Sequence, residues 1–292
     1  MTSDIAFIGF GEAASAIASG WSDRRNIRSY DIKTDDPKSA PDQWAKFEKF
    51  GVTGCHSSAE AVSGAKRVFS TATADQAVVT ARTAAPHLAS GTYWFDLNSC
   101  APSSKKEAAA LLEAVGVCYV DVAVMAPIHP KRNMTPLLVS GPHAQEAKAI
   151  LADLPMAPRI VEGPVGAASS IKMIRSVMVK GMEALTAECI LAARAAGVDE
   201  AVLASLKGGN PPVNWPAQAA YNFERVMLHG VRRASEMREV VKSLEDLGLP
   251  ADMARATVDW QSRIGTLGIP AAEGADYADL ADQLLPHVRT DD

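Results

Sequence analysis

Long hydrophobic runs and an excess of positive charge are both missing from this sequence. No apolar stretch approaches the ~18 residues that a membrane-spanning helix needs, so we expect no membrane partner. No basic leader precedes the apolar segment Ile5–Phe10, and we expect no signal peptide. With 29 Lys and Arg against 34 Asp and Glu, the formal charge is −5. This balance argues against a broad basic surface and therefore against nucleic acid as a partner.

Cysteine is also scarce, with four residues in the chain. Cys55, Cys100, Cys118 and Cys189 lie far apart and form no CxxC pair, whereas such pairs are typical of zinc sites and redox motifs. We therefore expect reduced thiols in a cytoplasmic protein, with no disulfide framework and no metal site.

The composition that is present is that of an ordinary globular protein, with 48% hydrophobic residues over 292 positions, enough for about two domains. Up to about residue 163, short apolar runs alternate with amphipathic stretches. This alternation predicts an α/β fold, with a mostly parallel, doubly wound sheet of Rossmann type. The expected strands are Ile5–Gly9, Ile27–Asp31, Arg67–Thr71, Thr92–Leu97, Val117–Val124, Leu137–Ser140 and Arg159–Val161. The expected helices between them are Ala13–Ser22, Asp42–Phe50, Ala74–His87, Ser104–Val115 and Ala144–Leu154.

The strand pattern stops after Gly163-Pro164. The Ala-rich stretch Val165–Ala196 predicts one long helix that ends at Gly197. A helix of ~30 residues is ~45 Å long, which indicates that it leaves one domain and continues into the next. The sequence thus predicts two domains, 1–163 and an all-helical 164–292. Further helices are expected at Glu200–Leu206, Ala217–Leu228, Ser235–Leu247 and Ala251–Arg263, with a break at Gly208–Pro212.

The first expected strand is followed by a glycine turn that opens the first helix, Gly9-Phe10-Gly11-Glu12-Ala13-Ala14. In a GxGxxA dinucleotide fingerprint, the glycines permit the turn and the approach of a pyrophosphate, and the alanine lets helix and strand pack closely. The helix N-terminus adds backbone N–H groups for the phosphates. The alternative is a glycine turn of any α/β protein, but the strand–turn–helix context favours a dinucleotide-binding domain over 1–163. The expected cofactor-binding residues of this part are Gly9, Phe10, Gly11, Glu12, Ala13 and Asp31.

Asp31 ends the second expected strand, twenty residues after Gly11. An acid at this place accepts hydrogen bonds from the adenosine ribose. Asp31 favours NAD, because its carboxylate would repel a 2′-phosphate. The nearby Lys33 could serve that phosphate, so NADP stays possible.

Two further stretches carry a family resemblance. At the start of the long helix, Gly166 and Lys172 fall on the first glycine and the lysine of a GxGxxxKxxxN pattern, while Ala168 and Ser176 replace its second glycine and its asparagine. The segment Asp96–Pro102 is similar to a DxSTxxP segment. In these motifs and in their order, the chain resembles the β-hydroxyacid dehydrogenases, the family of 3-hydroxyisobutyrate dehydrogenase and 6-phosphogluconate dehydrogenase, in a less characterised branch.

The resemblance implies an NAD(P)-dependent oxidation of a hydroxy acid, or the reverse reduction, with Lys172 as general acid/base. Burial beside a positively charged nicotinamide would lower the pKa of this lysine towards neutrality. The ordinary alternative is a solvated helix lysine. Ser176, one turn further on, would hold the lysine or a substrate hydroxyl. The resemblance also places Ala72, Thr73 and Ser99 beside the nicotinamide half of the cofactor.

Two departures from the family pattern concern the substrate. Where the family has an SGG sequence that grips the substrate carboxylate, this chain has Met125-Ala126-Pro127, and proline has no N–H to donate. In the helical domain the family's lysine is lost, while Arg232 lies one turn earlier and Trp215 offers an aromatic lining. We therefore expect Met125, Ala126, Arg232 and Trp215 to line a site for a bulkier or less acidic small-molecule substrate.

Other functions are compatible with parts of the sequence. An imine reductase shares the architecture but usually carries Asp or Tyr in place of the catalytic lysine. A Rossmann methyltransferase gives no reason for the Lys172 helix or for the helical second half. A dehydrogenase-like module that binds NAD without turnover stays open, because the SGG and Asn positions are altered. Finally, an Ala-rich face of the long helix suggests a homodimer, through Ala184, Ala187, Ala192 and Ala195.

Overall fold

The computed structural model describes residues 4–22, 27–206 and 213–288. Contacts between residues divide the chain into two units, Met1–Met173 and Ile174–Asp292. The first unit contains the whole sheet, whereas the described part of the second contains only helices. The α/β class and the all-helical C-terminal region predicted from the sequence are confirmed.

The sheet has eight strands in the order β3-β2-β1-β4-β5-β6-β7-β8. Neighbouring strands are parallel, except that β6 and β7 are antiparallel. The order runs outwards in both directions from β1 and β4, which makes their junction the switch point of a doubly wound sheet. The strands are β1 (Ile5–Ile8), β2 (Ile27–Tyr30), β3 (Thr53–Gly54), β4 (Arg67–Ser70), β5 (Tyr93–Asp96), β6 (Cys118–Val124), β7 (Pro136–Ser140) and β8 (Ala157–Ile160).

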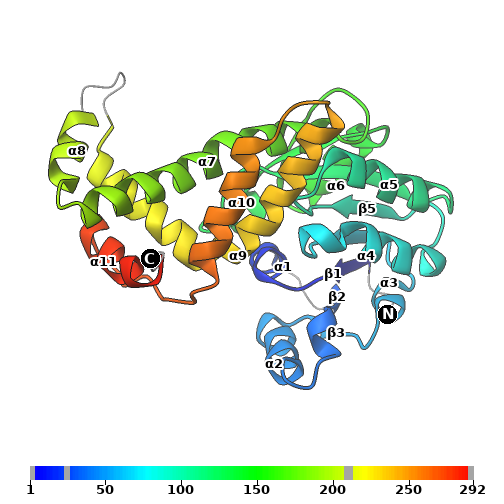
Figure 1. Ribbon diagram of the computed structural model, residues 1–292. Coiled ribbons are helices and arrows are strands. Elements are labelled where there is room, and N and C mark those ends of the chain that lie inside the picture. The colour runs from blue at the N-terminus through cyan, green and yellow to red at the C-terminus, as the bar shows by residue number, and fades with distance from the viewer. Residues whose placement is uncertain (1–3, 23–26, 207–212, 289–292) are drawn as a thin grey trace. The chain divides into compact units, whose positions relative to one another are not determined.

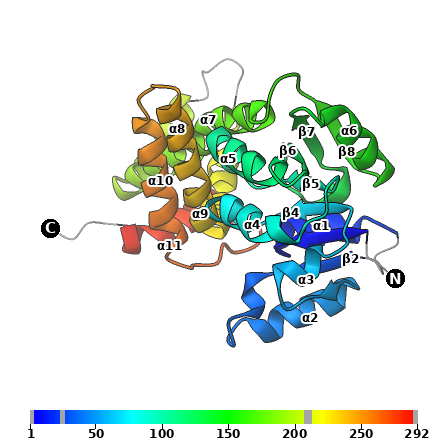
Figure 2. The same cartoon turned by 90° about the vertical axis from the view of Figure 1, so that its right-hand side faces the viewer.

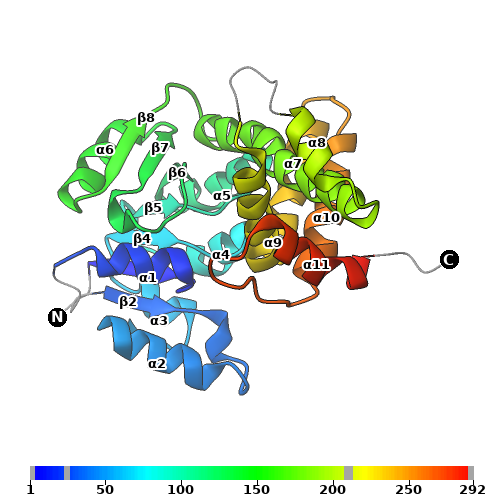
Figure 3. The same cartoon turned by 90° about the vertical axis from the view of Figure 1, so that its left-hand side faces the viewer.

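Both faces of the sheet are covered by helices. Along β1, Phe7 joins one buried cluster while Ala6 and Ile8 join another, as the two-residue period of a strand requires. The cluster of Phe7 is closed by α1, α2 and α6, and the opposite cluster by α3, α4 and α5. Figures 2 and 3 view these opposite faces. The helices are α1 (Glu12–Ser19), α2 (Ala40–Phe50), α3 (Ser58–Val62), α4 (Ala77–Ala84), α5 (Pro102–Glu113) and α6 (Ala144–Asp153), with short 3-10 turns at Ile32–Thr34, Ala74–Gln76, Ala85–His87 and Arg132–Met134.

Two long helices form much of the described part of the second unit. The five helices from the end of the sheet onwards are α7 (Ala167–Ala195), which begins in the first unit, α8 (Asp199–Leu206), α9 (Trp215–Asp246), α10 (Asp252–Gly265) and α11 (Tyr277–Val288). Helices α9 and α10 run side by side (Figure 1). Phe223 and Val226 of α9 are fully buried in the core of this unit, with Leu280 and Leu284 of α11. No described helix has the length and hydropathy of a membrane span.

The prediction of separate helices at Ala217–Leu228 and Ser235–Leu247 is wrong, because both belong to α9. Gly230, which weakens the helical pattern there, is a packing position. A Cβ on Gly230 would clash with the carbonyl oxygen of Gln261 and would lie 2.8 Å from the Cα of Gly265. The close approach of α9 and α10 at this point therefore requires a glycine on each helix.

Several short or irregular elements were missed. The sequence pattern did not indicate β3, α3 or α11, of which β3 is two residues long and α11 contains Pro286. The predicted break at Gly208–Pro212 lies outside the described residues. The last strand ends at Ile160, while the contact-based division comes after Met173. A domain boundary after residue 163 stays a prediction.

Candidate active site

The glycine turn after β1 has the geometry that a dinucleotide needs. Gly9 adopts a φ of +86°, and a Cβ there would lie 2.8 Å from the carbonyl oxygen of Thr71, so only glycine fits. Gly11 precedes α1, and a Cβ on it would meet no atom within 4 Å. The backbone at the start of α1 is therefore open to a close approach, as a pyrophosphate at a helix N-terminus requires.

The other fingerprint residues face different surroundings. The ring of Phe10 is fully buried and packs on Phe7 and Phe47. Glu12 is exposed and Ala13 is half-buried. The side chain of Phe10 therefore belongs to the core, and a contact between Phe10 and the cofactor stays a prediction.

Asp31 follows β2 directly and is buried. Its Oδ2 accepts the backbone N–H of Phe10 (2.6 Å), and its Oδ1 accepts that of Lys33 (3.0 Å). These bonds fix the carboxylate at the edge of the fingerprint turn. Lys46 of α2 lies within electrostatic reach of the same carboxylate, and its pKa is lowered by burial first and by Lys33 second, against the opposing effect of Asp31.

The loop after β4 meets the fingerprint turn. The Oγ1 of Thr71 donates a hydrogen bond to the carbonyl oxygen of Gly9 (2.7 Å), and the backbone nitrogen of Ala72 would lie 3.0 Å from a Cβ on Gly9. Ala72 is half-buried and Thr73 is exposed. Both predicted residues therefore lie at the switch point, where ligands bind in open α/β sheets.

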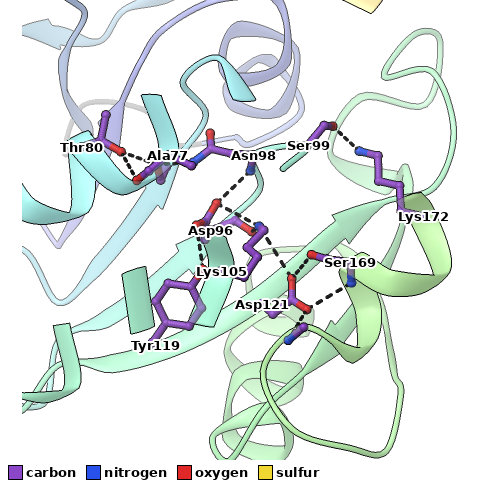
Figure 4. Close-up of polar contacts among 12 residues, drawn as sticks. Ala77, Thr80, Asp96, Asn98, Ser99, Lys105, Tyr119, Asp121, Ser169 and Lys172 are labelled. Carbon is purple, nitrogen blue, oxygen red and sulfur yellow. Dashed lines mark hydrogen bonds and ion pairs between the residues drawn. The ribbon is translucent and has the colours of Figure 1, made fainter. Parts of the chain in front are cut away.

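Lys172 and Ser99 come from distant parts of the sequence and meet in the first unit. The Nζ of Lys172, in the second turn of α7, donates a hydrogen bond to the Oγ of Ser99 (2.6 Å), in the loop after β5 (Figure 4). Both residues are half-buried. An amine at this position can exchange a proton with a hydroxyl group that lies beside it.

Asn98, next to Ser99, is a candidate that the sequence reasoning missed. Its backbone N–H donates to the Oδ1 of Asp96 (2.9 Å) and its Nδ2 to the Oγ of Ser70 (2.9 Å). Its Oδ1 is buried, and no donor reaches it among the described residues. A buried acceptor of this kind requires a donor, which fits a hydroxyl or amide group of a bound cofactor. The signal was the departure from DxST, because Asn98 stands in place of its serine.

A buried ion cluster was also missed. The Nζ of Lys105 on α5 lies 2.9 Å from the Oδ1 of Asp96 and 3.6 Å from that of Asp121. Burial by itself lowers the pKa of Lys105, but the negative charge of its neighbours, Asp96 above all, outweighs burial and raises it. Lys105 falls on the same helix face as Ala108 and Leu112, both buried. A lysine on that apolar face was the available signal.

Met125 and Ala126 follow β6 and are half-buried. The side chain of Met125 packs against a small cluster that includes Leu138 and Ala168 of α7, so an apolar group stands where the family grips a carboxylate. No group of three possible metal ligands occurs among residues 4–22, 27–206 and 213–288.

The other predicted residues belong to the second unit. Ser176 is buried on α7, one turn after Lys172. The side chain of Arg232 is half-exposed, and its Nε lies 3.9 Å from the Oε1 of Glu236. The indole of Trp215 donates to the carbonyl oxygen of Leu206 (2.9 Å) and packs against the helical core. The structure thus gives Trp215 a packing role, and its contact with a substrate stays a prediction.

Comparisons with known proteins agree with this architecture. Residues 4–157 match the family described as the NAD binding domain of 6-phosphogluconate dehydrogenase, and residues 193–264 match a domain of unknown function, DUF1932. No curated protein matches the chain.

Solved structures include three of particular interest. A conserved hypothetical protein from Sinorhizobium meliloti 1021 is 35% identical, with a TM-score of 0.72, over 99% of this chain and 97% of its own. The conserved protein MTH1747, described as structurally similar to 3-hydroxyacid dehydrogenases, is 27% identical, with a TM-score of 0.65, over 91% and 99%. Mycobacterium tuberculosis 3-hydroxyisobutyrate dehydrogenase, solved with L-serine, is 18% identical and shares the fold, with a TM-score of 0.72, over 97% and 99%.

The glycine turn, the switch-point loops and the NAD-binding match cover the same unit of the chain. The helical DUF1932 match follows in the second unit. The chain therefore belongs to the β-hydroxyacid dehydrogenase family, in a branch that joins the NAD-binding domain of 6-phosphogluconate dehydrogenase to a DUF1932 domain.

Proposed function

We propose that this protein is an NAD(P)-dependent oxidoreductase that oxidises a hydroxy acid, or a related primary or secondary alcohol, and reduces the corresponding carbonyl in the reverse direction. The observation that carries the proposal is the 2.6 Å contact between the Nζ of Lys172 and the Oγ of Ser99. It supports a general acid/base at a fixed position in the unit that matches the NAD-binding family.

In this proposal Lys172 handles the proton. When the nicotinamide is bound, its ring accepts the hydride from the substrate carbon, or returns it. The Nζ of Lys172, as a free amine, takes the proton from the substrate hydroxyl, and in the reverse direction its ammonium form donates that proton to the carbonyl oxygen. Ser99 holds the amine in place, and Ser176, one turn along α7, holds the lysine or the substrate hydroxyl.

The cofactor half of the site rests on backbone geometry. Gly9, Gly11 and the start of α1 cradle the pyrophosphate, while Ala72 and Thr73 border the nicotinamide half. Asn98 offers its buried, unpartnered Oδ1 as an acceptor for a donor group of the cofactor. Asp31 favours NAD, because a fixed carboxylate repels a 2′-phosphate.

The substrate is proposed to be bulkier or less acidic than a three- or four-carbon hydroxy acid. Met125 packs in an apolar cluster, and the following Ala126-Pro127 offers fewer N–H donors than an SGG backbone. In the second unit, the half-exposed Arg232, whose Nε lies 3.9 Å from the Oε1 of Glu236, is proposed to meet a polar group of the substrate.

We propose a homodimer through α7, in which Ala192 and Ala195 are the exposed members of the predicted alanine face. Ala184 and Ala187 are buried within the chain itself. The same helix carries a stripe of exposed apolar side chains, Ile174 (51%), Met178 (67%) and Leu185 (55%), whose spacing places them on one face. A second copy of the chain that covers this stripe would remove it from water.

A spectrophotometric screen tests the proposed function. Hydroxy acids and aromatic alcohols are offered with NAD⁺ and with NADP⁺, and the absorbance of the reduced cofactor is followed. We expect turnover with at least one alcohol and a preference for NAD⁺. Turnover of 3-hydroxyisobutyrate at ordinary rates, without preference for larger alcohols, would contradict the proposed substrate class.

The same screen separates the alternatives. Cofactor binding without turnover of any alcohol or carbonyl would indicate a non-catalytic NAD-binding module. Reduction of cyclic imines, with no activity on carbonyls, would indicate an imine reductase. Lys172 argues against the second outcome, because that group usually carries Asp or Tyr at this position.

A further inference from the structure

A cluster of buried charges lies near the Lys172–Ser99 pair (Figure 4). Lys105 is fully buried, with Asp96 and Asp121 fully buried around it. Its Nζ donates to the carbonyl oxygen (2.6 Å) and the Oδ1 (2.9 Å) of Asp96, and it lies 3.6 Å from the Oδ1 of Asp121. One ammonium group thus joins two carboxylates from two adjacent strands, β5 and β6 (Figure 4).

The carboxylate of Asp96 holds the loop that carries Ser99. Its Oδ1 accepts the backbone N–H of Asn98 (2.9 Å), one residue before Ser99. Its Oδ2 accepts the hydroxyl of Tyr119 on β6 (2.7 Å). With Lys105 bound to its carbonyl oxygen as well, Asp96 is fixed on all sides, and the direction in which the loop leaves β5 is fixed with it.

The carboxylate of Asp121 holds the start of α7. Its Oδ2 accepts the backbone N–H groups of Gly166 (3.0 Å) and Ser169 (3.1 Å), and its Oδ1 accepts the hydroxyl of Ser169. Ser140 on β7 donates to the same Oδ2 (3.0 Å) and accepts the N–H of Ala168 (3.0 Å). Asp121 thus acts as the cap of α7, where a negative charge is favoured by the helix dipole.

Gly166 permits this arrangement. It adopts a φ of +101°, which L side chains rarely occupy, and a Cβ on it would lie 3.1 Å from the Cβ of Pro102 on α5. The first turn of α7 is therefore packed closely against α5 while its N–H groups point at Asp121. Ser169 lies three residues before Lys172, on the same helix face, so the rotation of α7 at Ser169 sets the direction of Lys172.

We propose that Lys105 is a positioning residue for the proposed reaction. Through Asp96 it holds the loop of Ser99, and through Asp121 and Ser169 it holds the first turn of α7. By fixing both the loop and the helix, it sets the contact between Lys172 and Ser99. The chemical role of this contact rests on the proposed function, whereas the positioning of Lys172 by Lys105 does not. Without Lys105, two buried carboxylates would face each other with no cation between them, and the loop and the helix would move apart.

The test measures the reactivity of the Lys172 amine and needs no substrate. The whole protein is labelled with a trace of acetic anhydride at fixed pH, and the acetylation of each lysine is measured by peptide mass spectrometry relative to Lys148, an exposed lysine of α6. While Ser99 holds the amine, its access to the reagent is limited. Ser99→Ala therefore defines the acetylation rate of Lys172 in the absence of its bond to Ser99.

Two variants probe the network, and one serves as matched control. Lys105→Met removes the cation, and Ser169→Ala removes one hydroxyl and keeps the backbone cap. Ser170→Ala is the control, because among the described residues the Oγ of Ser170 bonds only the carbonyl oxygen of Gly166, one helix turn earlier (2.7 Å). We expect Lys105→Met and Ser169→Ala to raise the acetylation rate of Lys172 at least threefold, to the value of Ser99→Ala, and Ser170→Ala to leave it unchanged.

If Lys105→Met does not fold, the Ser169→Ala variant tests whether the network positions Lys172. A folded Ser169→Ala variant with the wild-type rate at Lys172 would overturn the inference, and so would a Ser99→Ala rate equal to that of the wild type. A raised rate in Ser169→Ala and Ser99→Ala, with no turnover of any alcohol or carbonyl by the wild type, would support the positioning role and contradict the proposed function. The two failures are thus distinct.

Discussion

The Oδ2 of Asp31, at the end of β2, accepts the backbone N–H of Phe10 in the turn after β1, at 2.6 Å. This bond ties the carboxylate proposed to bind the adenosine ribose to the turn proposed to bind the pyrophosphate. In the proposed function, the two ends of the adenosine diphosphate half of the cofactor would contact two loops that this hydrogen bond joins.

Replacement of Asp31 should change cofactor preference. Asp31→Ser removes a charged acceptor, and hydrogen bonds to charged groups contribute about 1.5–3 kcal/mol, so NAD⁺ should bind roughly tenfold or more weakly. NADP⁺ should lose less or gain, because the repulsion of the 2′-phosphate is relieved and Lys33 and Lys46 remain nearby. Isothermal titration calorimetry with both cofactors measures this. Asp36→Ser, at an exposed position, is the control, and an unchanged NAD⁺/NADP⁺ ratio in Asp31→Ser would argue against the ribose role.

The two fingerprint glycines should respond differently to substitution. Gly9→Ala forces a side chain into a positive φ and against the carbonyl of Thr71, so it should destabilise the fold by about 1–3 kcal/mol. Gly11→Val fills space in which no protein atom lies within 4 Å of the Cβ, so it should leave the melting temperature nearly unchanged but weaken NAD⁺ binding. Thermal unfolding and cofactor titration separate the two effects. Equal losses of stability in both variants would contradict an open approach at Gly11.

Lys180 should make stability depend on pH in the alkaline range. Burial, as the largest cause, lowers the pKa of Lys180 below 10.5, and Arg233 and Arg232 lower it further, against the effect of Glu236. Between the lowered folded value and 10.5, the unfolded chain binds more protons than the folded one, so stability should rise with pH in that window. Urea unfolding at several pH values below 10.5 measures the slope.

Lys180→Met should remove this rise. The variant removes the ammonium that lies 2.5 Å from the Oε2 of Glu236, but Arg232 still lies 3.9 Å from the Oε1 of that carboxylate. The free energy of unfolding should therefore change by less than it does when a buried charge is left without any partner. A rising slope that persists in the variant would show that another group is its source.

The exposed stripe of α7 should hold two copies of the chain together. Met178→Glu places a charge at its most exposed position and should shift a dimer towards monomer, because burying an unpaired charge in an interface is costly. Val79→Glu, at an exposed apolar position of α4 and away from the stripe, is the control. Light scattering after size-exclusion chromatography reports the mass. A monomeric wild type would contradict the proposed dimer.

Local patterns predicted much of the fold. The apolar run of β1, the turn at Gly9 and the helix that follows are set by neighbours in sequence, so the nucleotide end could be located in advance. The sequence could not show that Gly230 is a packing contact between two helices and not a helix break. The residue against which Gly230 packs, Gly265, lies 35 residues away in the sequence. Short elements such as β3 were also not predictable, because two residues are too few to show the alternation of apolar and polar side chains that marks a strand.

The site was predictable only where its residues lie in motifs. Lys172 and Ser99 were expected in the site, but their direct contact follows from tertiary structure. The place of Lys105 on an apolar helix face is a local signal of burial, but its two carboxylate partners, Asp96 and Asp121, are identified only by the tertiary structure. Asn98 likewise becomes a candidate only once its unpartnered oxygen is seen.

The most direct test of the account is the turnover of Lys172→Ala with the best substrate of the screen. Loss of the general acid/base should lower kcat by roughly 10²–10⁴-fold, while NAD⁺ affinity stays within about twofold because the fingerprint is untouched. Lys148→Ala, an exposed lysine of α6, should keep the wild-type kcat. A Lys172→Ala variant that turns over as fast as the wild type would contradict the central claim that this amine carries the proton.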